Sequence, residues 1–175
     1  MLSPSLFLVV RLIHVVVGIA WGGTIVFMAT FLLPTLKAVG PAAGPIMGHL
    51  VEKKKLPLYM MAGVLLTVLS GLVLYRSDSA GFHSEWMKSG PARTFGAGGV
   101  LAIIVAVMGM AINAPTARKL SALGEAVRAS GGPPSDAQAA EMHRLQARLA
   151  GAMKVAAVLV LATAALMAVA RYVPI

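Results

Sequence analysis

The hydrophobic positions of the chain fall into four long runs, separated by shorter segments that hold most of the charged residues. An α-helix needs about 20 apolar residues to cross a bilayer. The runs allow spans at about 12–36, 57–76, 94–114 and 151–172. Small residues are frequent in them, and small residues let helices approach closely in lipid. We predict an all-α fold, a polytopic membrane four-helix bundle, with residues 1–175 as a single membrane domain.

The segment between the third and fourth runs is long enough to form structure of its own. Residues 116–130 have helical periodicity, a Gly-Gly-Pro-Pro sequence breaks it, and Ser135 with Gln138 matches a capping box. From there a helix can continue into the fourth run without a break. We predict a helical hairpin at 116–150 that stands off the membrane, and we expect Pro115 to end or kink the third helix.

Composition agrees with a membrane protein and limits its chemistry. The 175 residues are 58% hydrophobic and include no cysteine, which excludes disulfides, thiolate metal sites and iron–sulfur clusters. The formal net charge is +9. The cations flank the apolar runs, which favours topology control and contact with anionic lipid over nucleic-acid binding.

The distribution of lysine and arginine predicts an orientation. The first and third connecting segments, counted together with Lys154 at the start of the fourth span, hold 10 of these residues, against 5 in the rest of the chain. By the positive-inside rule we expect these two segments, including the hairpin, in the cytoplasm. Both termini would then lie on the periplasmic side of a bacterial inner membrane.

One stripe of the first run combines residues that packing alone does not require. Arg11, His14, Gly18 and Trp21 recur every three or four residues and share one helix face. His14 is the one histidine inside an apolar run, and ionisable side chains at that depth mark functional sites. No Asp or Glu lies inside a predicted span, which argues against a carboxylate-based ion transporter. We interpret His14 as a metal ligand, against the alternative that it hydrogen-bonds a neighbouring helix.

A b-type haem fits the residues that this topology places towards the periplasmic face. Haem iron takes an axial histidine, and its propionates suit cations at the interface. His14 would be the ligand, Gly18 would leave room for the ring and Trp21 would lie nearby. The propionates would meet arginines at the ends of all four spans, Arg11, Arg76, Arg93 and Arg171. The alternative role of each arginine is a cap that reaches the interface.

Several ways of completing a metal site stay open. His83, in the second connecting segment, is a candidate second metal ligand, or an ordinary solvated histidine. A homodimer or an open sixth position would also complete a haem iron. The 11 methionines offer a copper site with His14, because thioethers bind Cu(I). Their scatter favours adaptable packing instead.

The first run also resembles known families. His14 followed seven residues later by Trp21-Gly22-Gly23 is similar to the first helix of the copper-resistance D family, and of related four-helix membrane proteins of unassigned function. The same His-to-Trp spacing resembles the four-helix membrane protoporphyrinogen oxidase, a haem protein. These resemblances imply haem or, second, copper.

We therefore expect a membrane protein that binds haem b, serves electron transfer or oxidoreduction and forms a homodimer. Its partners would be the lipid bilayer and a redox partner or quinone, and no nucleic acid. One alternative is a non-enzymatic protein of copper uptake or tolerance that uses His14 and methionines, and another is a purely structural partner subunit.

Overall fold

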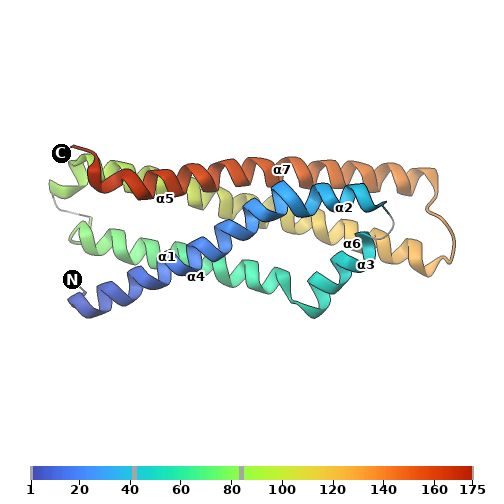
Figure 1. The fold of residues 1–175 in the computed structure, drawn as a ribbon, viewed down its shortest axis with the longest axis horizontal. Coiled ribbons are helices and arrows are strands. Elements are labelled where there is room, and N and C mark those ends of the chain that lie inside the picture. Colours follow the sequence, from blue (N-terminus) through green and yellow to red (C-terminus); the bar gives the residue numbers. More distant parts are fainter. Residues whose placement is uncertain (1, 41–42, 83–84, 175) are drawn as a thin grey trace.

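The computed structural model describes residues 2–40, 43–82 and 85–174. These ranges contain no strand, and nearly all of their residues are helical. Within them, four helical stretches are long and apolar enough to cross a membrane: Pro4–Val39, Leu56–Asp78, Gly90–Ala129 and Asp136–Tyr172. They lie along one long axis, with both termini at the same end (Figure 1). The predicted all-α four-helix membrane bundle is confirmed.

The first two spans form an antiparallel pair. Helix α1 (Pro4–Phe27) passes through a π-helical turn (Met28–Leu32) into α2 (Leu33–Val39). The short helix α3 (Ala43–Gly48) and a second π-helical turn (His49–Lys53) then lead to α4. Helix α4 (Leu56–Asp78) carries Pro57 in its first turn, where a missing N–H costs nothing.

The last two spans form the second antiparallel pair. A 3₁₀ turn (Glu85–Lys88) precedes α5 (Gly90–Met108), which passes through a π-helical turn (Gly109–Asn113) into α6 (Ala114–Ala129). Helix α7 (Asp136–Val169) returns along the whole length of the bundle and ends in a 3₁₀ turn (Ala170–Tyr172). We call the end with both termini the terminal end and the opposite one the hairpin end (Figure 1).

Two of the π-helical turns end two residues before a proline. In each, the residue before the proline donates its N–H to a carbonyl five residues back, Leu33 to Met28 and Ala114 to Gly109. The proline that follows has no N–H, and its ring crowds the carbonyl four residues earlier. The wider turn gives the ring space, so the helical path continues past Pro34 and Pro115. Pro115 therefore alters the third helix without ending it.

The start of α7 has the local structure that its sequence predicts. The Ser135 hydroxyl accepts a hydrogen bond from the Gln138 N–H at 3.3 Å, and the Gln138 side chain accepts one from the Ser135 N–H at 2.9 Å. The predicted capping box is confirmed. Helix α7 then runs for 34 residues without a break. Its first part packs against α6, and the two form a hairpin at the hairpin end (Figure 1).

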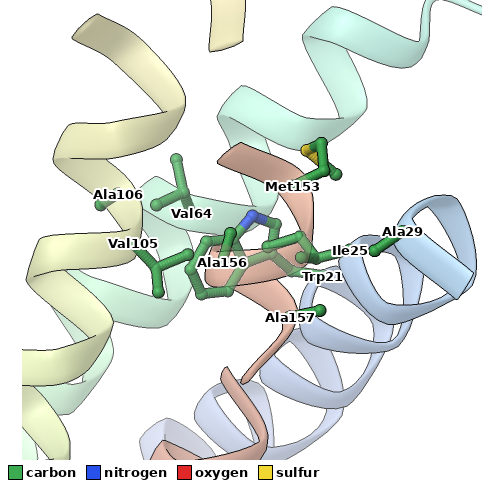
Figure 2. Close-up of a cluster of buried hydrophobic side chains, with 9 residues drawn as sticks. All are labelled: Trp21, Ile25, Ala29, Val64, Val105, Ala106, Met153, Ala156 and Ala157. Carbon is green, nitrogen blue, oxygen red and sulfur yellow. The ribbon is translucent and has the colours of Figure 1, made fainter. Parts of the chain in front are cut away.

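The core lies near the middle of the bundle and draws on all four spans (Figure 2). It consists of large residues set among small ones: Trp21, Ile25, Ala29, Val64, Val105, Ala106, Met153, Ala156 and Ala157. Away from the core, large apolar side chains such as Leu8 and Ile19 are exposed on the outside of the bundle. Such a surface suits hydrocarbon, which is the solvent of a membrane span.

Candidate functional site

His14 lies on the side of α1 that faces α4. Its Nδ1 atom is 2.9 Å from the carbonyl oxygen of Thr67 and 3.2 Å from the hydroxyl oxygen of Ser70. A carbonyl oxygen can only accept, so Nδ1 carries a proton and donates it to Thr67. In the neutral imidazole the lone pair then lies on Nε2. No described residue forms a hydrogen bond with Nε2.

Glycine residues on α4 allow this helix to pack closely against the face of α1 that carries His14 and Trp21. A Cβ atom added to Gly71 would lie 2.8 Å from Cε1 and 3.2 Å from Nδ1 of His14. Contacts under about 3 Å force a shift, so alanine at this position would displace the imidazole ring or helix α4. Deeper in the bundle, a Cβ atom at Gly63 would lie 3.1 Å from the Cβ of Trp21. The ring of His14 is thus positioned by one close contact and one short hydrogen bond.

Gly18 and Trp21 serve packing in the structure. A Cβ atom at Gly18 would meet the Thr67 methyl group at 3.4 Å. Helix α4 therefore fills the space beside Gly18 that we expected a haem ring to use. Trp21 is 5% exposed and belongs to the central core (Figure 2). Both residues therefore take part in the association of the helices.

The four arginines of the expected polar layer are all exposed at the terminal end, namely Arg11, Arg76, Arg93 and Arg171. Arg11 and Arg171 both act electrostatically on Asp78, the last residue of α4. Neither arginine forms an ion pair with Asp78. No ion pair joins Arg76 or Arg93 to a described residue. Two positive charges thus act on the single Asp78 carboxylate.

An aromatic cluster lies between α4 and the start of α5. The Tyr75 hydroxyl donates to the carbonyl of Ala92 at 3.1 Å. The Tyr75 ring lies 5.4 Å from the Trp86 ring and 6.2 Å from the Phe82 ring, between centroids. Amphipathic rings of this kind are frequent at membrane interfaces. This cluster joins residues from separate elements and was not predicted from the sequence.

The candidate second metal ligand, His83, lies outside the described residues. Among the residues that are described, no group of three or more His, Asp or Glu side chains could hold a metal ion. A metal at His14 would therefore have to bring most of its own ligands, as haem does. Three of the methionines are used in packing: Met28 and Met60 pack against the central core, and Met153 is part of it.

Two grooves open at the surface, both away from His14. The larger, of about 540 Å³, lies between α7 and the π-helical turn after α1, with Lys154 on its wall. The smaller, of about 210 Å³, lies between α7 and the start of α6. Neither groove is lined by His14.

Comparison of the chain with protein-family models, curated proteins and solved structures found no match. The functional interpretation therefore rests on the residues of the seam between α1 and α4 and on the charges at the terminal end.

Proposed function

We propose that this protein binds b-type haem through Nε2 of His14 and serves electron transfer or oxidoreduction in the bacterial inner membrane. One observation carries the proposal: the other ring nitrogen, Nδ1, donates to the Thr67 carbonyl at 2.9 Å. Histidines that bind metals typically donate their second N–H to a carbonyl or carboxylate, which fixes the tautomer and the ring orientation. His14 has this arrangement in an apolar stretch where an unused imidazole is costly.

The chain offers further residues that suit the group. Arg11 and Arg171 supply positive charge beside Asp78, and arginine pairs well with carboxylates such as haem propionates. The side of α1 turned away from His14 is apolar and exposed, with Leu12, Val15 and Ile19. A second copy of the chain would suit this surface. We propose a homodimer on this basis.

A bound haem would supply reversible one-electron transfer, with a quinone or another redox partner in the membrane. The contribution of the chain is to hold the proton of His14 on Nδ1, to present Nε2 and to keep water away with apolar side chains. We propose that the termini and this site face the periplasm. The first and third connecting segments, with Lys154, hold 10 of the 15 basic residues, and the positive-inside rule assigns such segments to the cytoplasm.

The test is the haem content of the purified protein, read from its Soret band and from the α and β bands after reduction. We expect coloured wild-type protein and loss of haem in His14→Ala. His49→Ala and His143→Ala are matched controls, since both histidines are exposed and lie outside the apolar runs. Full haem retention in His14→Ala would contradict the assignment. Colourless wild-type protein with stoichiometric copper would support the copper alternative.

A further inference from the structure

The smaller groove, at the start of α6, gathers basic side chains from two helices. It has a volume of about 210 Å³ and is lined by three cations together with Pro115, Thr116 and Leu145. The cations are Lys119 on α6 and Arg144 and Arg148 on α7. Arg144 and Arg148 are four residues apart, so a helix places them on one face. Regular helices hold all three positions, and Leu145 between them is buried.

The charges of this groove do not balance within the chain. Both the Nε atom and one terminal nitrogen of Arg144 donate to the Glu141 carboxylate at 2.7 Å. Lys119 also acts electrostatically on Glu141. Arg148 forms no ion pair with a described residue. Three positive charges and one negative charge leave a net charge of +2, which favours an anionic ligand.

The position of the groove along the bundle narrows the choice of anion. Its wall includes Ala111, in the π-helical turn that ends the apolar part of the third span. Arg148 precedes the apolar part of the fourth span by a few residues. The groove therefore lies where apolar side chains give way to charged ones, which is the depth of lipid headgroups. Basic pockets between spans at this depth recognise anionic headgroups.

We propose that the groove binds the phosphodiester of an anionic phospholipid. The guanidinium of Arg148 offers a planar set of donors that matches phosphate oxygens, and Lys119 adds a point charge from the opposite wall. Ala111 and Leu145 suit the start of the acyl chains, which a free phosphate would not need. This site is independent of the haem proposed at His14, because the two lie at opposite ends of the bundle.

The test is native mass spectrometry of the full chain in detergent, titrated with phosphatidylglycerol or with phosphatidylcholine of the same acyl chains. We expect tighter binding of phosphatidylglycerol. Arg148→Gln and Lys119→Gln should each weaken it by about fivefold, since a basic residue near an anionic membrane surface contributes about 1 kcal/mol. Arg118→Gln is the matched control, because Arg118 is exposed on the same turn of α6 and does not line the groove.

Three results would overturn the proposal, provided that circular dichroism shows unchanged helix content. Equal binding of the two lipids would exclude a phosphatidylglycerol-specific site. An equal loss in Arg118→Gln would show diffuse attraction by net charge. Binding of inorganic phosphate with the same dependence on Arg148 and Lys119, without phosphatidylglycerol binding, would assign the groove to a free anion.

Discussion

Replacement of Gly71 by alanine tests whether the imidazole of His14 is held as tightly as the structure indicates. The new Cβ atom would lie 2.8 Å from Cε1 and 3.2 Å from Nδ1 of His14. A ring at the far end of a flexible side chain can often move aside at a small cost in free energy. Here Nδ1 is bonded to the Thr67 carbonyl, so movement of the ring away from Gly71 also strains that bond.

The size of the effect follows from three contributions. Overpacking by one methyl group costs about 1–3 kcal/mol, and weakening the Nδ1 hydrogen bond costs about 1 kcal/mol more. Alanine is favoured over glycine inside a helix by about 1 kcal/mol, which offsets part of the loss. The free energy of unfolding should therefore fall by about 1–3 kcal/mol in Gly71→Ala. Haem content should fall as well, because Nε2 moves with the ring.

The measurement is denaturant unfolding of the purified protein in detergent, repeated in a His14→Ala background. The three heavy atoms closest to the new Cβ all belong to His14. Without that ring, Gly71→Ala should be neutral or stabilising, with a coupling energy of about 2 kcal/mol. Gly99→Ala is the matched control on α5, since its Cβ would meet nothing within 4 Å. A loss that is equal with and without His14 would refute the reasoning.

Three further outcomes follow from the fold and its orientation. Trp21→Ala should lower the free energy of unfolding by about 3–5 kcal/mol, measured as above, because its indole fills the central core; a change below 1 kcal/mol would contradict this packing. A reporter fused to the C-terminus should be active only if it functions in the periplasm, and cytoplasmic activity would reverse the orientation. Replacing residues 121–143 by a short flexible linker should leave haem content unchanged, and its loss from a folded protein would place the site elsewhere than at His14.

Local features of the fold were predictable because their signals are local. Run length locates the spans, since the bilayer sets the number of apolar residues that a helix needs. The Ser135 capping box depends on residues three apart in the chain, and the structure forms it as expected. Pro115 was less informative, because a proline can end a helix, kink it or be accommodated. The π-helical turn that accommodates it has no clear sequence signal.

The partners of His14 could not be predicted from the sequence. Thr67, Ser70 and Gly71 interrupt the second apolar run with small or polar side chains, which is a signal for close packing. Pairing them with His14 needs the rotation of α4 about its axis and its register against α1, and neither is encoded in a single helix. The same limit applies to Gly18, because its contact with Thr67 also depends on the rotation and register of α4.

The most direct test of the haem proposal is the addition of imidazole to a His14→Gly variant, followed by its visible spectrum. The variant should bind little haem or show an altered spin state. Free imidazole should restore the wild-type spectrum, because the Thr67 carbonyl remains to accept its N–H. A His14→Gly protein with full haem and a wild-type spectrum, before imidazole is added, would contradict the assignment of His14 as axial ligand.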